Sequence, residues 1–238
     1  MAEWFVRLEG HQFDLMELGR QLTSPELNFT TDDDGYWLRS TRFTPMTDSS
    51  EVHATAEQLL QQINGAGRIF SGDFRPVRQA GIQRRHKDGR RDQFVFAQGM
   101  ASGRSMVFAA ASVAGGTPQP QPIQPNDLTF AALHAQGDEA VARALRILGS
   151  REPDWVNLYR VFEIVKADIS SSISAKGWAT KTQIGRFKHT VNSVGAIGDD
   201  ARHGAEHGQP PKNPMPLEEA QGLIRSILRA WVSSKRPA

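Results

Sequence analysis

The sequence predicts an α+β protein in which a mixed α/β region precedes a bundle of helices. Residues 1–113 combine β-like runs with amphipathic helical segments. Residues 114–127, AGGTPQPQPIQPND, hold four prolines and two glycines, which cannot continue a helix or a central strand. Residues 128–238 carry apolar side chains at helical spacing. We therefore predict an α+β domain over 1–113, a proline-stiffened linker over 114–127 and an all-α up-and-down bundle over 128–238.

The first half begins with short elements of alternating type. The run WFVRLEG predicts a strand and FDLMELGRQL predicts a short helix. The turn-rich stretch Asp32-Asp33-Asp34-Gly35 precedes GYWLRSTRF, which predicts another strand. These runs are typical of a mixed α and β region.

A second helix is expected over residues 51–67, because apolar side chains recur there three and four positions apart. Gly65 is expected to cap its C-terminal end. Two β-like runs, RQAGIQRRH and DQFVFAQG, then flank Lys87-Asp88-Gly89, and Asp-Gly between such runs indicates a β-hairpin. Residues 105–113, SMVFAAASV, fit either a strand or an apolar helix.

The second half is expected to be helical throughout. Residues 127–149 form either one helix or two helices broken at Gly137. EPDWVNLYRVFEIVKADI and TKTQIGRFKHTVNSV place their apolar residues along one stripe. PLEEAQGLIRSILRAWV does the same, and its proline and two glutamates suit the first turn of a helix. Amphipathic helices in this number and at this density predict a bundle.

Composition excludes several classes of protein. The 238 residues contain no cysteine, so disulfides, thiolate metal sites and a cysteine nucleophile are ruled out, and a cytoplasmic location is expected. The first ten residues include Glu3 and Arg7 and lack the apolar run of a signal peptide. No window approaches the roughly 18 apolar residues of a membrane span. The net charge of +2 does not by itself indicate a nucleic-acid partner.

Residues 201–211, ARHGAEHGQPP, carry the densest candidate chemistry. His203, Glu206 and His207 match the string H-x-x-E-H, in which two histidines hold zinc and the glutamate acts as a base. That chemistry needs a continuous helix through both histidines, whereas two glycines and a Pro-Pro pair interrupt this segment. A metal-free site is therefore favoured over a zinc hydrolase.

Arg202 and His207 provide that metal-free alternative. On a straight helix, side chains five positions apart point about 140° away from each other. The two groups meet only if the helix stops near His203 and Gly204 lets the chain turn back. Histidine exchanges protons near neutral pH and a guanidinium group clamps a phosphate. Because RNA supplies its own 2′-hydroxyl nucleophile, such a pair can cut RNA without a metal.

The helical half resembles the HEPN superfamily (higher eukaryotes and prokaryotes nucleotide-binding), whose small helical bundles are common in bacterial toxin and defence proteins. Arg202, His203 and His207 match its motif of an arginine, a polar residue and a histidine a few positions on. WVNLYRVFEIVKADI and LEEAQGLIRSILRAWV look like the helices that flank this motif. The resemblance covers about residues 128–235 and none of the first half.

The resemblance implies an endoribonuclease that works without metal or cofactor and pairs two motifs across a homodimer. Arg202 would then clamp the phosphate, His207 would act as acid and base, and His203 would fill the polar position. Glu163, on the preceding long helix, would orient the site. The first half would bind a protein or small molecule and regulate or target the second. The alternative is a non-catalytic HEPN-like module that dimerises or binds nucleic acid or protein.

Further charged residues are candidates for supporting roles. Asp199 and Asp200 either orient His207, bind a metal, or simply cap a helix end. Two groups of basic residues fit either an RNA-contacting surface or a plain solvated surface. They are Arg84, Arg85, Lys87, Arg90 and Arg91 in the predicted hairpin, and Lys181, Arg186 and Lys188 in a helix without acidic neighbours in sequence.

Overall fold

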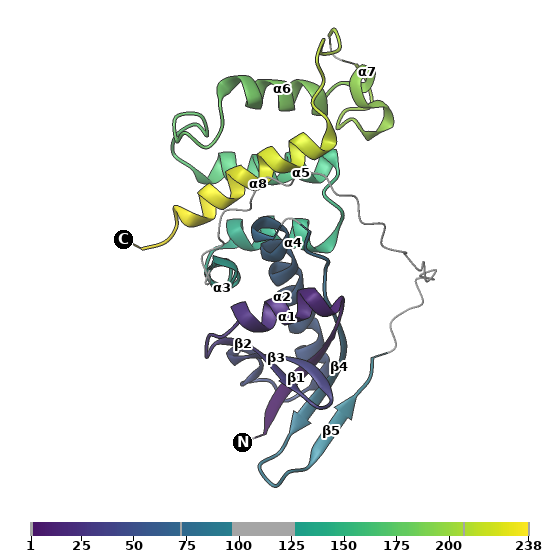
Figure 1. The fold of residues 1–238 in the computed structure, drawn as a ribbon, viewed down its shortest axis with the longest axis vertical. Coiled ribbons are helices and arrows are strands. Elements are labelled where there is room, and N and C mark those ends of the chain that lie inside the picture. The colour runs from purple at the N-terminus through teal and green to yellow at the C-terminus, as the bar shows by residue number, and fades with distance from the viewer. Residues whose placement is uncertain (1, 72, 97–126, 207, 238) are drawn as a thin grey trace.

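The computed structural model describes residues 2–71, 73–96, 127–206 and 208–237. The predicted α+β class is confirmed, because an antiparallel sheet lies at one end of the molecule and helices extend from it to the other end (Figure 1). The strands are β1 (Glu3–Glu9), β2 (Leu27–Asp32), β3 (Gly35–Ser40), β4 (Arg78–Arg85) and β5 (Arg91–Phe94). The helices are α1 (Gln12–Gln21), α2 (Ser49–Phe70), α3 (Asp127–His134), α4 (Glu139–Ser150), α5 (Trp155–Asp168), α6 (Lys181–Val191), α7 (Val194–Ile197) and α8 (Leu217–Ser233), with short 3-10 turns η1 (Thr41–Phe43) and η2 (Gly198–Asp200).

The sheet region has a definite topology. The chain runs β1, α1, β2, β3, α2, β4, and the sheet order is β2-β3-β1-β4-β5 with every neighbouring pair antiparallel. A β-α-β-β-α-β order with β1 and β3 at the centre is the ferredoxin-like arrangement, to which β5 adds an edge strand. Many unrelated functions occur on this arrangement, so it does not by itself indicate one.

Alternation along β1 decides which face of the sheet is covered. Trp4, Val6 and Leu8 belong to the hydrophobic core, whereas Arg7 points to the opposite face and is exposed. Val6 lies directly opposite Leu38 of β3, so both central strands bury the same face. The amphipathic α1 and α2 cover this face, whereas the other face carries the rings of Phe5 and Trp37 together with charged side chains such as Arg7 and Arg85.

The predicted hairpin at Lys87-Asp88-Gly89 is confirmed as the turn between β4 and β5. Gly89 has a φ of +86°, a conformation that favours glycine. The carboxylate of Asp88 accepts a hydrogen bond from the backbone N–H of Arg90 at 3.0 Å. The Asp-Gly pair therefore closes the turn for the local reason that the sequence indicates.

The prediction that Gly65 caps a helix is wrong. Helix α2 continues to Phe70 and ends at Ser71. Gly65 instead lies where α2 crosses α4, and a Cβ atom placed on it would lie 2.1 Å from the carbonyl oxygen of Leu145. A Cβ atom on Gly149 of α4 would lie 1.8 Å from the carbonyl oxygen of Gln61. These two glycines allow the backbones of α2 and α4 to approach closely.

Strand β2 is an element that the sequence analysis does not predict. Its pairing with β3 places Phe29 opposite Leu38 and Thr30 opposite Trp37. Only Leu27 and Phe29 alternate as buried residues, and the run ends in aspartates that indicate a turn. Residues 105–113 and 114–126 lie outside the described residues, as do the alternatives predicted for them.

The break predicted as one alternative at Gly137 is present. It separates α3 from α4, and the side chain of Asp138 caps α4 by accepting from the N–H of Val141 at 3.0 Å. Helices α3 and α4, which follow the predicted linker, pack on α2, which precedes it. The buried apolar residues of both halves form one cluster.

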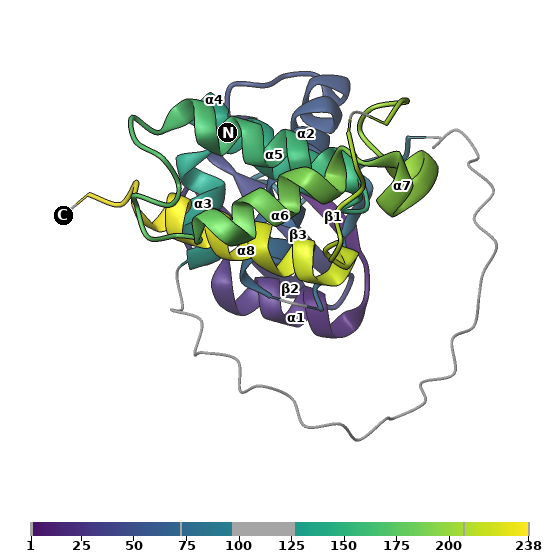
Figure 2. The same ribbon diagram turned by 90° about the horizontal axis from the view of Figure 1, so that it is seen from above.

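Helices α5, α6 and α8 form the end of the molecule opposite the sheet (Figure 1), and seen from above their axes run in similar directions (Figure 2). Phe187 of α6 is fully buried and its ring lies 6.4, 6.2 and 5.7 Å from the rings of Trp155, Tyr159 and Phe162 of α5. This aromatic cluster fixes α6 on α5. None of the described helices is long and apolar enough to cross a membrane.

Candidate functional site

The chain between α7 and α8 folds back on the C-terminal end of α6. The backbone N–H of Arg202 donates to the carbonyl of Val191 at 2.9 Å, and Nε2 of His189 lies 2.9 Å from the carbonyl oxygen of Gln209. Both ends of this segment, Arg202 and Gln209, thus contact the last turn of α6. We call residues 202–209 the return loop. Residues 202–206 and 208–209 lie outside any helix, whereas His207 lies outside the described residues, so its approach to Arg202 stays a prediction.

The side chain of Arg202 is held by two residues of α5. Its guanidinium carbon lies 4.1 Å from the centre of the Tyr159 ring, and its Nη2 lies 3.5 Å from Oε1 of Glu163. Tyr159 and Glu163 are four positions apart on one helix and therefore share a face. The Arg202 side chain remains 33% exposed. A cation–π contact and an ion pair thus orient this guanidinium group while solvent still reaches it.

Glu163 and Arg202 were both predicted as site residues, and the structure brings them together. Tyr159 lies on the apolar stripe predicted for this helix and is 7% exposed. The sequence signal for its second contact is its position one turn before Glu163 on the same face of α5. His203 is exposed in the return loop.

Glu206, part of the predicted zinc string, holds the return loop in place. Its carboxylate accepts from the N–H of Gly195 at 2.6 Å and from Oγ of Ser193 at 3.0 Å. Ser193 precedes α7 and makes no side-chain cap of its own. From the return loop, Glu206 therefore satisfies one backbone N–H donor in the first turn of α7, that of Gly195. Asp199 and Asp200 lie in η2 and are exposed.

The described residues do not form the helix that the zinc interpretation requires. Residues 201–206 have no helical turn, so His203 has no helical neighbour one turn away in this stretch. Within the described part of the chain, no three His, Asp or Glu side chains gather closely enough to hold a metal ion. The donor arrangement therefore gives the zinc interpretation no support.

Most basic residues of the hairpin are paired within the protein. Arg85 binds Asp32 at 2.8 Å, and its guanidinium carbon lies 4.1 Å from the ring centre of Phe5 and 4.7 Å from that of Trp37. This stacking leaves Phe5 and Trp37 almost completely buried on the open face of the sheet. The two rings are therefore covered by arginine rather than free to stack on a base.

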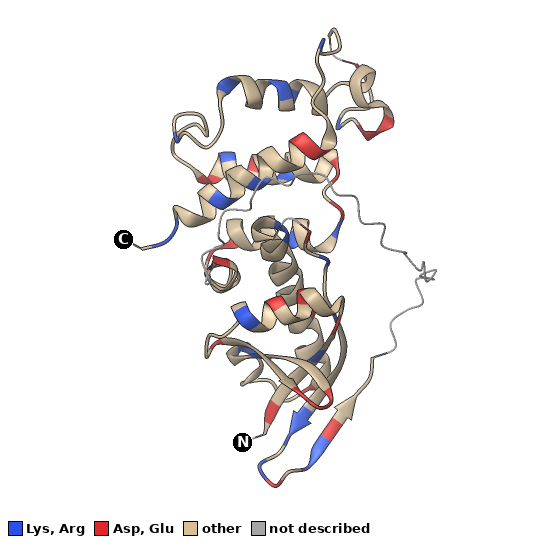
Figure 3. Ribbon diagram, viewed as in Figure 1, with Lys and Arg blue, Asp and Glu red and all other residues tan. Residues whose placement is uncertain are grey.

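The remaining hairpin cations have mixed surroundings. Arg84 lies over the ring of Trp4 at 5.0 Å, and Arg91 binds Asp34 at 2.9 Å. Arg90 lies 3.8 Å from Asp92, and Lys87 is exposed in the turn. Figure 3 shows basic and acidic segments side by side along this hairpin. The local charge is thus largely balanced, which weakens attraction to a phosphate backbone.

Arg186 of α6 has an acidic neighbour that is distant in sequence. It binds Glu219 of α8 at 2.6 Å and donates to the carbonyls of Asn213 and Pro214, both at 3.0 Å. These bonds tie the start of α8 to α6. Lys181 and Lys188 are exposed on the same helix.

Comparison with known proteins adds no further information. No family model, curated protein or solved structure matches this chain. Its function is therefore inferred from the side chains that the fold brings together, above all from Arg202 and its two partners on α5.

Proposed function

We propose that the chain is a metal-independent RNA endonuclease of the HEPN type, with residues 128–238 as its helical bundle. The observation that supports this proposal is the position of Arg202 at the start of the return loop, oriented by Tyr159 and Glu163 and open to solvent. An oriented and accessible guanidinium group is suited to binding a phosphodiester. The return loop also carries His207, the proposed acid and base.

The proposed reaction uses the 2′-hydroxyl of the RNA as the nucleophile. His207 accepts the proton of this hydroxyl as its oxygen attacks the adjacent phosphorus atom. The bond from phosphorus to the 5′-oxygen breaks, and that oxygen takes up a proton, giving a cyclic phosphate and a free hydroxyl. Arg202 stabilises the negative charge that develops on the phosphate oxygens.

Glu163 is compatible with phosphate binding by Arg202. A guanidinium group has five N–H donors arranged in a planar fork. The described contact to Glu163 involves Nη2 at 3.5 Å, which leaves other donors for a phosphate. Glu163 therefore acts in this proposal as a positioning residue that fixes the orientation of Arg202.

The test is cleavage of single-stranded and structured RNA by the purified full chain in excess EDTA. We expect wild type and the control Arg143→Gln, which removes an exposed cation on α4, to cleave equally. His207→Ala should lower the cleavage rate by about 100-fold or more, because general acid–base catalysis contributes this much. The products should carry cyclic phosphate ends. Absence of wild-type cleavage, or an unchanged rate in His207→Ala, would refute the proposal.

A non-catalytic HEPN-like module is the second candidate, and the bonds of Glu206 favour it. Glu206 stabilises α7, and Arg202 is already paired with Glu163, so both residues have structural roles. This candidate predicts that RNA binds without being cut. Filter binding of labelled RNA beside the cleavage assay separates the two: retention of intact RNA by both wild type and His207→Ala supports the module.

A further inference from the structure

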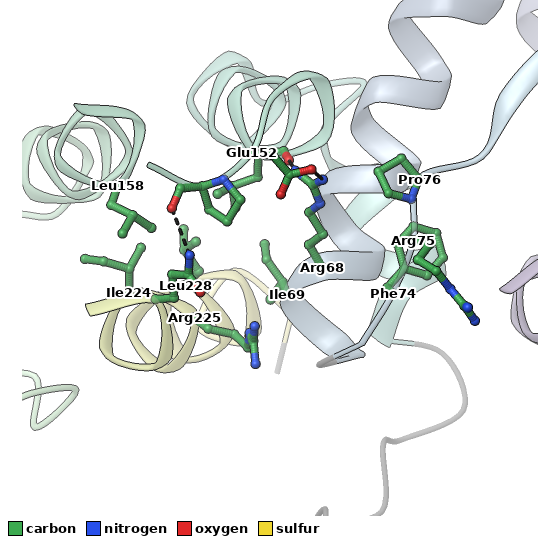
Figure 4. A pocket seen from close by; sticks show the side chains of 13 residues that line it. Arg68, Ile69, Phe74, Arg75, Pro76, Glu152, Leu158, Ile224, Arg225 and Leu228 are labelled. Atoms are coloured by element: carbon green, nitrogen blue, oxygen red, sulfur yellow. Dashed lines mark hydrogen bonds and ion pairs between the residues drawn. The ribbon is translucent and has the colours of Figure 1, made fainter. Parts of the chain in front are cut away.

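A pocket lies between the C-terminal end of α2 and helices α4, α5 and α8 (Figure 4). Its volume is about 290 Å³, close to the lower limit for small-molecule sites. Four helices contribute apolar residues to its lining, which are Ile69, Leu148, Leu158, Ile224 and Leu228, and Phe74, Pro76 and Pro153 add to them from the connecting segments. Such walls can remove the apolar body of a small organic molecule from water.

Two of the cations that line the pocket are already neutralised. Arg68 donates to the carbonyl of Leu148 at 2.6 Å and pairs with Glu152 at 2.9 Å. Arg75 pairs with Asp14 at 2.8 Å, and in Figure 4 its guanidinium group points away from the pocket. These residues shape the pocket but contribute little free charge.

Arg225 is different, because no residue in the described part of the chain pairs with it. Its side chain extends from α8 towards the end of α2 that carries Ile69 (Figure 4). It is half-buried, and within the described residues it makes no hydrogen bond or ion pair. The residues outside the described ranges include no Asp or Glu, so they supply no side-chain carboxylate for it.

A second arginine increases the positive potential at this point. Arg229 lies one helical turn after Arg225 and donates to the carbonyls of Ile69 and Phe70 at 2.7 and 3.1 Å. Burial and the neighbouring charge of Arg225 lower the pKa of Arg229 below its ordinary value, although the charge of Asp127 acts in the opposite direction. The two like charges therefore repel each other, and a bound anion would relieve this repulsion.

Gln221, one helical turn before Arg225 on α8, offers a further contact in the pocket. Its Nε2 donates to the carbonyl of Pro153 at 3.1 Å, which fixes the amide group. In the described structure its side-chain carbonyl accepts no hydrogen bond from the protein. A ligand hydroxyl or amine can therefore donate to this oxygen.

We propose that this pocket binds a small organic anion with an apolar body, whose carboxylate or phosphate pairs with Arg225. The apolar body lies against Ile69, Leu158 and Ile224, and a donor group of the ligand reaches Gln221. Because the pocket joins α2 to α5 and α8, binding involves residues from both halves of the chain. This proposal does not depend on RNA cleavage.

The experiment measures binding of naphthoate, naphthyl phosphate and neutral naphthamide to the full chain by isothermal titration calorimetry. We expect one saturable site for at least one anion and much weaker binding of naphthamide. Arg225→Gln should weaken anion binding about tenfold, because a charge-assisted hydrogen bond is lost. Comparison of the two anions distinguishes a carboxylate site from a phosphate site.

The matched control is Arg143→Gln, which makes the same change of charge on the exposed surface of α4. It should bind the anions as wild type does. Thermal unfolding checks that both variants are folded. No saturable binding of either anion, equal binding of naphthamide, or equal weakening in both variants would overturn the proposal.

Discussion

Gly65 and Gly185 both lie within helices, but only Gly65 is packed too closely against its neighbours to accept a side chain. A Cβ atom on Gly65 would lie 2.1 Å from a backbone oxygen of α4, and backbone cannot move aside as a flexible side chain can. A Cβ atom on Gly185 of α6 would meet nothing within 4 Å. The same substitution should therefore have opposite effects at the two positions.

We expect Gly65→Ala to lower the free energy of unfolding by about 1–3 kcal/mol or more, because it forces α2 and α4 apart. Gly185→Ala should raise it by about 0.5–1 kcal/mol, because alanine favours the helix. Urea unfolding followed by circular dichroism measures both changes. A stable Gly65→Ala variant would contradict the close helix crossing.

The sequence predicted which residue types make up the candidate site, but not how their side chains are arranged in space. The residue types and spacing of Arg202 and His207 indicate a phosphodiester site, and Glu163 was expected nearby. The stacking of Arg202 on Tyr159 depends on how the return loop packs against α5. Arg225 gave no sequence signal, since its lack of a partner is defined only by the folded surroundings.

Helices α4, α5 and α8 are joined at one end by an ionic cluster. Nζ of Lys235, just after α8, lies 2.7 Å from a carboxylate oxygen of Asp138 and 2.7 Å from one of Asp168. Trp231 also donates to Asp168 at 2.8 Å. Asp138 precedes α4 and Asp168 ends α5, so Lys235 links the end of α8 to two helices that lie much earlier in the chain.

The pKa of Asp138 follows from this position. Burial acts to raise the pKa, but the hydrogen bonds from Lys235 and the N–H of Val141, with the charges of Lys235 and His134, outweigh it. The pKa in the folded state is therefore lower than in the unfolded state. Its contribution to stability is present above the unfolded pKa and is lost as the pH falls through the folded one.

Asp138→Asn isolates this charge, because asparagine keeps the helix cap. We expect the variant to be less stable than wild type by about 1 kcal/mol at neutral pH. The difference should shrink as the pH falls below about 4, because the carboxylate of the unfolded state is protonated first and that of the folded state follows at lower pH. Urea unfolding at a series of pH values measures it. A difference that does not change with pH would show that the charge contributes nothing.

The periodicity of apolar residues predicted the longer elements well. It failed for short elements, which hold too few residues to show a pattern. Helices α5, α6 and α8 follow stripes of apolar residues, and the β4–β5 turn follows Asp-Gly. Strand β2 has only Leu27 and Phe29 as buried alternating residues, and it is defined by its pairing with β3. Such a short strand can be identified only from its pairing with a neighbouring strand, because its own residues show too little alternation.

At the scale of the whole molecule, the two halves of the chain share one core. Helix α4 packs on α2 through Gly65 and Gly149, and Arg229 of α8 caps the end of α2. We therefore expect full-length protein to unfold in one cooperative transition, with circular dichroism and tryptophan fluorescence changing together. Two separated transitions would instead support independent domains over 1–113 and 128–238.

The sequence by itself determined the α+β class, the hairpin and most helices, because periodicity and turn chemistry act between near neighbours. It also supplied the residue types on which the proposed phosphodiester site is based. Only the tertiary structure decided that α2 and α4 cross at two glycines, that Arg202 lies on Tyr159 and that Arg225 lines a pocket without a partner among the described residues. These features join residues distant in the chain, and no local pattern encodes which distant backbone or charge a side chain will meet.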